Sequence, residues 1–549
     1  MNELLLHGGP VIAVDGRAHD AIAVRDGRIL AVGPGERVRT EVGEAAQSID
    51  LAGRCVIPSF IDPHNHFSFG AFEPAMVDCN TPPLDTLESV LEAIARACAD
   101  QPPGAWVRGW GYHAWRVAER RNPTRRELDE AAPDNPFLLI DSTYHAGYVN
   151  TRALEACRID DHTPDPRGGA IERDSGGAAT GTLIEAALDL PQMTSWSEYI
   201  DRDPAAALDL IEASSRRHLA LGITGVGDAL VLPKAIDLYR SAAEAGKLLV
   251  TVYQLHGGES FFAPPRLDLR AAPDLHVEHH RLLRSGTLKI FMDAAHPGPG
   301  AIDRRHGDCC VEHTGTNYYS AAEVEALALD AAEADLNIAI HCLGNCAIDH
   351  ALDAFELVRR RHGHKDLGLR IEHAFVAEAR QSKRMAELGV TVVSQPYVAH
   401  NWGDEWGSEF DLPLDDDPDN LRLVPLQSFQ EDGVMVAASS DYPCGVLSPF
   451  EIMWSAIARE SRTGAAVQAR EGVDRLSALR MLTINAAIAS GTADEEGSLE
   501  TGKRANLLIV DVNPLECPLE DLRSARVMAT YFDGELVSGL PEEAGPAGA

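Results

Sequence analysis

A pair of histidines separated by one residue is the first feature of this 549-residue chain that could carry out chemistry. His64 and His66 follow the apolar run that ends at Ile61. If that run is a β-strand, its two-residue period directs both imidazole rings to the same side. Neutral imidazoles bind divalent metal ions, so both residues are candidate metal ligands. The pair alone is weak evidence, because two structural histidines would produce the same pattern.

Three further candidates stand directly after apolar runs. His341 ends Asn337-Ile-Ala-Ile-His341, His373 ends Arg370-Ile-Glu-His373, and Asp441 follows the run Val434 to Ser440. An ionised aspartate at such a position could bind a metal and take a proton from a metal-bound water. Each residue also has a plainer interpretation, as a hydrogen-bonded core histidine or as a capping or loop aspartate.

Lys289 is unusual because it lies inside an apolar run, Leu288-Lys-Ile-Phe-Met292, in a chain with only six lysines. Burial would lower the pKa of its ammonium group, and the neutral amine could react with carbon dioxide to form a carbamate that bridges two metal ions. The alternative is a lysine whose stem lies along apolar surface while its amine reaches water or a carboxylate.

Short apolar runs that alternate with alanine-rich helical segments would position these residues. They favour a parallel α/β architecture, and eight of them predict a TIM-like (β/α)₈ barrel with the candidates at the carboxyl ends of its strands. A doubly wound sheet is the alternative. The predicted strands are Val56–Ile61, Ile223–Gly227, Leu249–Leu255, Thr287–Met292, Ile338–Ile340, Leu369–Glu372, Thr391–Ser394 and Val434–Ala438.

Two further units accompany the predicted barrel. About 150 residues separate its first two strands, far more than one crossover needs, so a large insertion follows strand one. Glycine turns between short β-branched runs at both ends of the chain predict one small β-sandwich domain built from both termini. The predicted ranges are 1–55 and 488–549 for the sandwich, 56–68 and 200–487 for the barrel, and 69–199 for the inserted cap.

The composition restricts the partners. The net charge of −36, from 84 acidic and 48 basic residues, repels phosphate backbones and anionic lipids. No window reaches the roughly 18 apolar residues of a membrane helix, and no basic leader precedes an apolar stretch. We therefore expect a cytoplasmic protein with a small-molecule substrate, no nucleic acid and no membrane, with a homodimer as an open alternative to a monomer.

Several motifs occur in an order that resembles one family. They are Pro58-Ser-Phe-Ile-Asp-Pro-His-Asn-His66, Gly181-Thr-Leu-Ile-Glu185, Gly222-Ile-Thr-Gly-Val-Gly-Asp228, Arg370-Ile-Glu-His373, Ser440-Asp-Tyr-Pro443 and Gly497-Ser-Leu-Glu-Thr-Gly-Lys503. Over nearly its whole length the chain resembles the amidohydrolase superfamily, and within it amidohydrolase family 3, the YtcJ-like group that includes N-substituted formamide deformylases. Two positions depart from the group: Gly227 replaces an expected histidine, and Asn65 is bulkier than the usual residue.

The resemblance implies a divalent metal site, with zinc as the expected ion and with one or two ions per chain. It implies that Lys289 is N6-carboxylated and that Asp441 is the catalytic base. The implied ligands are His64, His66, Lys289, His341, His373 and Asp441.

These features predict a hydrolase that cleaves a carbon–nitrogen bond other than a peptide bond by metal-activated hydroxide attack. The expected substrate is an N-substituted formamide or N-acyl amide; a cyclic amide, a lactone, an ester or deamination are alternatives, and a non-catalytic metal-binding protein is the least favoured. In the insertion, His145 is a candidate catalytic residue, and Trp110, Tyr112 and His145 are candidates for substrate binding. The aromatic and acidic segment 397–411 could form a lid or be an ordinary surface loop.

Overall fold

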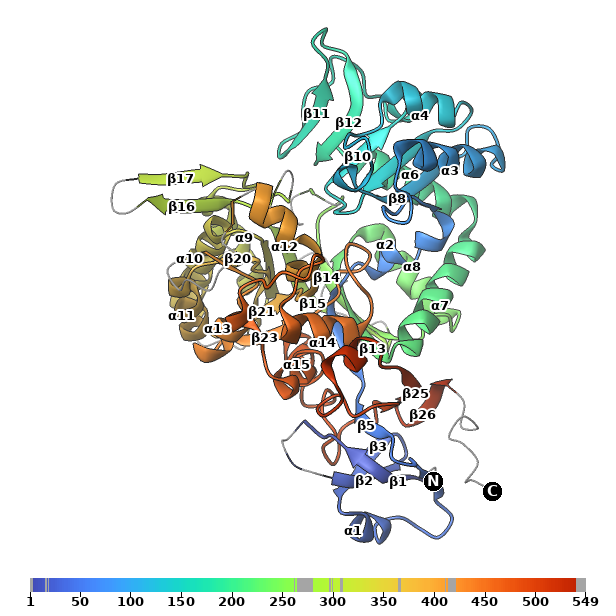
Figure 1. Ribbon diagram of the computed structural model, residues 1–549, viewed down its shortest axis with the longest axis vertical. Helices are drawn as coiled ribbons and strands as arrows, with labels where there is room; N and C mark the ends of the chain where they lie inside the picture. Colours follow the sequence, from blue (N-terminus) through green and yellow to red (C-terminus); the bar gives the residue numbers. More distant parts are fainter. Residues whose placement is uncertain are drawn as a thin grey trace.

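The computed structural model describes most of the chain. The described residues are 3–14, 17, 19–260, 262–263, 280–295, 298, 300–306, 310–363, 367–409, 411–412 and 421–539, with only the backbone described at 305, 306, 310, 311 and 409. Figure 1 shows three stacked parts: a small β domain with the N-terminus at the bottom, the barrel in the middle and the inserted cap at the top. None of the helices in these ranges combines the length and apolar character needed to cross a membrane.

The predicted (β/α)₈ barrel is confirmed by an eight-stranded parallel sheet. Its strands are buried on both faces, as all nine residues of β13 illustrate, because helices cover the outside and side chains fill the inside. In sheet order from the last strand to the first, they are β23 (Met435–Ala438), β21 (Val390–Ser394), β19 (Leu369–His373), β18 (Asn337–Cys342), β15 (Leu283–Phe291), β14 (Thr251–His256), β13 (Ile223–Val231) and β6 (Phe60–Asn65).

Helices of the βα units surround this sheet. Several begin at a sequence-encoded cap; for example, Ser320 and Glu323 form a capping box at the start of α9. The main barrel helices are α7 (Pro204–Ala220), α8 (Pro233–Glu244), α9 (Ala321–Glu333), α10 (Asn345–His362), α11 (Ala379–Leu388), α13 (Leu426–Glu431), α14 (Pro449–Ala458), α15 (Arg475–Met481) and α16 (Ile484–Ala489).

The first and last barrel strands are joined through polar side chains and the loops that follow them. Asp62 Oδ1 accepts a hydrogen bond from the Ser440 backbone N–H (2.9 Å), and Asn65 Nδ2 donates to Asp62 Oδ2 (2.8 Å). Asn65, the bulkier residue of the motif, therefore helps to close the barrel. Gly227 has an equally local explanation: a Cβ there would lie 2.2 Å from the Pro63 carbonyl oxygen.

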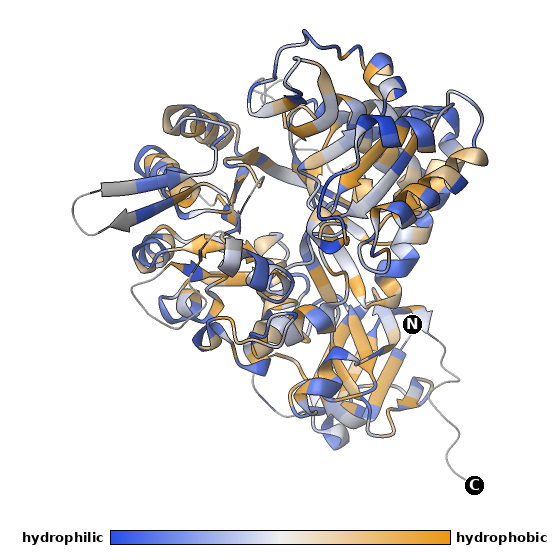
Figure 2. Ribbon diagram, turned by 45° about the horizontal axis from the view of Figure 1, so that its top comes forward, coloured by the Kyte–Doolittle hydropathy of each residue, from blue (hydrophilic) through white to orange (hydrophobic). Residues whose placement is uncertain are grey.

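Both ends of the chain contribute to the β domain, which contains one eight-stranded sheet. The sheet folds back on itself, because the β2–β3 turn bonds to residues before β24, as in Ala505 N–H to Gly27 O (2.8 Å). Its apolar strands appear orange in Figure 2. They are β1 (Glu3–Val11), β2 (His19–Arg25), β3 (Arg28–Gly33), β4 (Gln47–Asp50), β5 (Cys55–Pro58), β24 (Leu507–Val510), β25 (Val527–Phe532) and β26 (Glu535–Gly539).

One predicted strand is divided. The apolar run Val56–Ile61 belongs to two sheets, since β5 pairs with β24 in the terminal domain and the barrel begins at Phe60. The change occurs at Ser59, whose N–H donates to the Asn506 carbonyl (3.0 Å). The terminal domain thus continues through Pro58, beyond the predicted boundary at residue 55.

The insertion folds as a cap with its own six-stranded sheet and core. The sheet order is β11 (Gly169–Arg173), β12 (Ala179–Glu185), β10 (Ala146–Val149), β9 (Phe137–Asp141), β8 (Val107–Tyr112) and β7 (Val77–Asp78), with helices α3 (Leu87–Ala99), α4 (Arg125–Ala131), α5 (Thr151–Ala156) and α6 (Asp189–Arg202).

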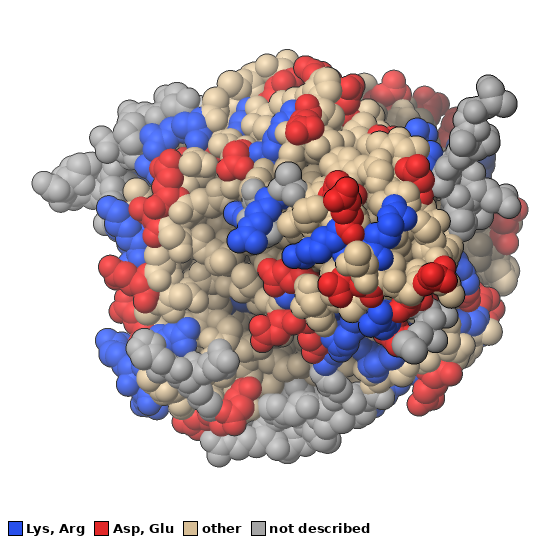
Figure 3. Space-filling model, turned by 90° about the horizontal axis from the view of Figure 1, so that it is seen from below, with Lys and Arg blue, Asp and Glu red and all other residues tan. Residues whose placement is uncertain are grey.

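Acidic and basic side chains are interspersed on the end of the molecule that carries the β domain (Figure 3). Among the described residues on this face, acidic side chains interrupt the basic ones.

Candidate metal centre

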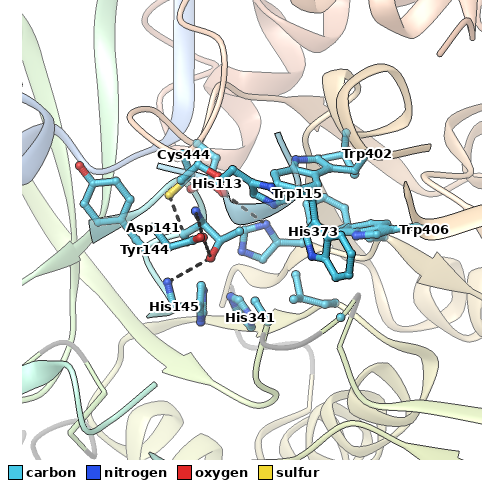
Figure 4. Close-up of a pocket in the computed structure, with 18 of the residues that line it drawn as sticks. His113, Trp115, Asp141, Tyr144, His145, His341, His373, Trp402, Trp406 and Cys444 are labelled. Atoms are coloured by element: carbon cyan, nitrogen blue, oxygen red, sulfur yellow. Dashed lines mark hydrogen bonds and ion pairs between the residues drawn. The ribbon is translucent and has the colours of Figure 1, made fainter. Parts of the chain in front are cut away.

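The six predicted ligands lie at one mouth of the barrel, around a cavity of about 460 Å³. Strand ends position them, as a parallel barrel requires. His64 is in β6 and His66 follows it, Lys289 is in β15, His341 in β18, His373 ends β19, and Asp441 follows β23. Figure 4 shows two of them, His341 and His373, beside the cavity.

Three of the four histidines lie close to the carboxylate of Asp441. Its Oδ1 is 3.3 Å from His64 Nε2 and 3.1 Å from His66 Nε2, and its Oδ2 is 4.0 Å from His373 Nδ1. The ring centroids of His341 and His373 are 4.5 Å apart. His64, His373 and Asp441 each offer a ligand atom within 4.8 Å of the others, so these three could hold one ion.

Several buried atoms at this mouth lack a hydrogen-bond partner among the described residues. They are His64 Nε2, His341 Nε2, Lys289 Nζ and Asp441 Oδ1. Unsatisfied buried polar atoms are costly, and four of them around one cavity suit a group that accepts several N and O donors. This donor set of imidazoles and a carboxylate fits zinc or a similar divalent ion.

Partners behind the ligands fix their orientation. His64 Nδ1 is 2.5 Å from Glu372 Oε2, and Arg370 Nε donates to Glu372 Oε1 (2.8 Å). Burial opposes ionisation of Glu372, but Arg370 and His64 lower the pKa of its carboxyl below the ordinary value. His373 Nδ1 is 2.8 Å from Gln395 Oε1. Such partners hold ligand rings in place. The sequence placed Glu372 within the Arg370–His373 motif but did not reveal its role.

The charge states of His341, His373 and Asp441 suit a metal site. Burial lowers the pKa of Lys289 to about 8 and that of His373 to about 3. Burial, with His373 and Lys289 nearby, also lowers the pKa of His341. For Asp441, burial is outweighed by His64 and His66, which hold its pKa well below the usual range. The site therefore favours two neutral imidazoles and an ionised carboxylate, the forms that bind metals.

Asp293 is an acidic residue at the site that sequence reasoning missed. It is fully buried, and its Oδ1 lies 3.6 Å from His341 Nε2. Backbone N–H groups of Ala301, Leu343 and Gly344 donate to it at 2.9 Å. These bonds come from distant loops, so no local pattern announces them.

Aromatic side chains form the outer wall of the cavity. Barrel residues contribute Phe291, Phe375, Tyr397, Trp402 and Trp406, and the cap contributes Trp115 and Tyr148. His145 also lines the cavity from the cap, and its ring centroid is 6.1 Å from that of His341.

The structure does not bring Trp110 and Tyr112 to this cavity. Trp110 packs against one core of the cap, and the buried Tyr112 donates its hydroxyl to the Arg121 carbonyl in another. The ladder of β8 shifts register between Gly109 and Tyr112, which changes the faces on which side chains emerge. His113 and Trp115, just beyond the strand, line the cavity instead.

Most of segment 397–411 forms α12 (Tyr397–Glu409), while Phe410 lies outside the described residues. Trp402 of this helix contacts the cap: the Arg116 guanidinium lies 4.8 Å from its ring centroid, and the His113 ring lies 5.0 Å away. The helix is thus a wall between the cap and the barrel.

Comparison with known proteins identifies the family of this chain. The model of the amidohydrolase family matches residues 47–538. The N-substituted formamide deformylase of Arthrobacter pascens is 48% identical over 98% of each chain. YtcJ of Bacillus subtilis is 26% identical, covering 97% of this chain and 98% of its own. The structure of a metal-dependent hydrolase from Pyrococcus horikoshii, 21% identical, superposes over 94% of this chain and 99% of its own with a TM-score of 0.73, which supports the fold. This chain belongs to the amidohydrolase family.

Proposed function

We propose that this protein hydrolyses the carbon–nitrogen bond of a small amide, with an N-substituted formamide or another N-acyl amide as substrate. The observation that carries the proposal is the convergence of four histidines, Lys289 and Asp441 on one aromatic-walled cavity. The relative from Arthrobacter pascens, named for formamide deformylation, supports this substrate class.

We propose zinc as the metal, with one or two ions held by the four histidines, Asp441 and an N6-carboxylated Lys289. When bound, such an ion polarises a carbonyl and lowers the pKa of water, so that a nucleophile is available at neutral pH. Burial of Lys289 increases the fraction of its amine that is neutral, and the neutral amine is the form that reacts with carbon dioxide.

Asp441 is the proposed base. Its carboxylate is ionised and adjoins His64 and His66, so it can accept a proton from water and deliver it to the departing nitrogen. His145 faces the same cavity from the cap, where its ring can hydrogen-bond to the N–H of the leaving nitrogen. His145 would therefore be a second catalytic and substrate-binding residue.

The remaining wall suits an apolar substituent on nitrogen. Trp402 and Trp406 stack with ring centroids 6.3 Å apart, and Phe375 lies 5.8 Å from Trp406. These surfaces would bind the apolar substituent and exclude water, while the polar inner end takes the acyl group. In this proposal α12 acts as the lid.

An activity screen with metal analysis tests the proposal. The zinc-supplemented protein is offered N-formyl and N-acyl amides, a cyclic amide, a lactone, an aromatic ester and an amino heterocycle. We expect turnover of the linear amides with bound zinc. Turnover of a different class alone would replace the substrate proposal, and metal-loaded protein inactive on every class would contradict hydrolysis. We also propose that the protein is cytoplasmic and has no macromolecular partner except a second copy of itself. Light scattering would detect such a dimer.

A further inference from the structure

His145 is held at the cavity by its surroundings. It lies in the loop between β9 and β10 of the cap and is almost fully buried. Its ring contacts Phe262, with centroids 5.4 Å apart, and faces His341. Figure 4 shows His145 next to His341. A ring in this position can act on a substrate only if the correct nitrogen carries the proton.

Glu185 fixes one edge of this ring. It ends β12, and its Oε2 lies 2.6 Å from His145 Nδ1. Its backbone N–H also donates to the His145 carbonyl (2.8 Å). Glu185 adopts a left-handed backbone conformation, with φ of 52°, that is uncommon for residues with a side chain. The carboxylate acts as acceptor, so the proton of His145 stays on Nδ1 and Nε2 is left on the opposite edge of the ring.

Tyr318 comes from the barrel, between β17 (Cys310–Thr314) and α9, and its hydroxyl donates to the same Oε2 of Glu185. The ring is buried and stacks on Phe262 at 5.6 Å. Cap residue Gly168 lies against it, where a Cβ would be 2.5 Å from Tyr318 Cδ1. The carboxylate of Glu185 therefore links a barrel side chain to a cap histidine.

A second contact strengthens the same junction at the surface. Arg167, next to Gly168, makes a bidentate ion pair with Glu323 of α9 (2.8 and 2.7 Å) and lies over Tyr319, 5.5 Å from its ring centroid. The surface pair contributes to docking of the cap, but only the buried Tyr318 reaches His145, through Glu185.

We propose that Glu185 and Tyr318 are positioning residues that set the tautomer and orientation of His145, so that His145 is correctly placed only when the cap is seated on the barrel. This inference rests on the proposed function, in which the ring of His145 hydrogen-bonds to the substrate amide. It adds that the unprotonated Nε2 accepts this hydrogen bond, that the cap supplies this acceptor, and that the barrel controls its position through Tyr318.

A double-mutant cycle tests this coupling. His145→Ala should lower kcat by about 100-fold or more. Tyr318→Phe, which keeps the stacked ring, should lower kcat by about 10-fold and Glu185→Ala by up to about 100-fold, with KM little changed. Glu185→Gln retains an acceptor oxygen without the charge, so its kcat should lie between that of Glu185→Ala and that of the unmodified protein. In the His145→Ala background, Tyr318→Phe should not lower kcat further.

Tyr319→Phe is the matched control, because it removes the neighbouring hydroxyl and keeps the ring beneath Arg167. It should retain normal kcat, and all variants should retain metal and thermal stability close to the unmodified protein. The inference is overturned if Tyr318→Phe behaves like Tyr319→Phe, or if it lowers kcat equally with and without His145.

A spectroscopic measurement separates this inference from the proposed function. In metal-loaded protein with ¹⁵N-labelled histidine, the signal lost in His145→Ala identifies residue 145. We expect the Nδ1-protonated tautomer in the unmodified protein and its loss in Glu185→Ala. The same tautomer in both proteins would overturn the inference. If no amide were hydrolysed but the tautomer changed as expected, only the proposed function would fail.

Discussion

Glu372 illustrates how single residues make this site. It has no solvent exposure, yet it lies between His64 and Arg370. With His64 Nδ1 held by Glu372, only Nε2 of that ring is left for a metal, and Nε2 is the atom beside Asp441. Gln395 holds His373 Nδ1 in the same way. Residues behind the ligands therefore decide which nitrogen faces the cavity.

Replacing Asp441 tests the proposed base. Asp441→Asn keeps the size of the side chain but removes its proton affinity, so kcat should fall by about 10²- to 10⁴-fold. The histidines are unchanged, so metal content should be close to normal. Steady-state kinetics and elemental analysis measure the two effects. Asp237→Asn, on the outer helix α8, is a control with normal activity, and full activity of Asp441→Asn would exclude its role as base.

Replacing Lys289 tests the carbamate. Lys289→Ala should lose most of its metal and activity, because it removes one of the six proposed ligands. Added bicarbonate or a short carboxylic acid should restore part of the metal by filling the space with a carboxylate. Lys247→Ala, which removes a surface ion pair with Asp209, should have no effect on metal content. Unchanged metal in Lys289→Ala would refute the proposal.

At the scale of elements, α12 and the cap enclose the cavity together. Arg116 of the cap lies over Trp402, and its Nη2 is 3.7 Å from Glu405 of the same helix. On another side of the cap, Tyr318 and Glu185 join the barrel to β12. The wall that would bind the substituent on nitrogen is thus held by contacts between separate units of the fold.

Truncating Trp402 tests this wall. Trp402→Ala should raise KM by about tenfold for amides with a large apolar group on nitrogen, because aromatic contact area is lost, and should change kcat little. An N-methyl amide, which cannot reach the wall, should show almost no change. Kinetics across substrates of increasing size measure the effect. An equal loss for small and large substrates would show that the substitution disturbs the catalytic end instead.

Across the whole molecule, the features that could be predicted are those that local sequence patterns encode, such as the barrel strands and the residues that follow them. The eight barrel strands are short apolar runs buried on both faces, and three of the six candidate ligands, His341, His373 and Asp441, follow such runs directly, so their meeting at one mouth follows from the barrel itself. The division at Ser59 was not predictable, because Val56–Ile61 is apolar throughout and the partner of its first half is β24, some 450 residues away.

Other failures have the same physical origin. The register shift in β8 moved the cavity-facing positions from Trp110 and Tyr112 to His113 and Trp115. Glu185 and Tyr318 are separated by 133 residues, and Asp293 receives hydrogen bonds from loops before and after β18. Contacts of this kind depend on three-dimensional packing and have no period in the sequence.

Metal removal should destabilise the whole molecule. A ligand that binds the folded chain stabilises it by about 2.7 kcal/mol at a concentration 100 times its Kd. Treatment with a chelator should therefore lower Tm, and added zinc should restore it. Calorimetry with and without chelator measures the change. A chelated protein with unchanged Tm and no remaining metal would show that the centre contributes nothing to folding.

The metal-free protein should also be sensitive to acid. Burial lowers the pKa of His373 to about 3 from an ordinary value of 6.5, and the pKa of His341 is lowered as well. Between pH 3 and pH 6.5 the unfolded chain binds more protons at these histidines than the folded chain does. Their contribution to stability is therefore greatest above pH 6.5 and falls as the pH decreases towards 3. Replacing His373 with Gln should flatten this dependence in urea unfolding of the metal-free protein. An unchanged slope in the His373→Gln protein would assign the acid sensitivity to groups outside the metal centre.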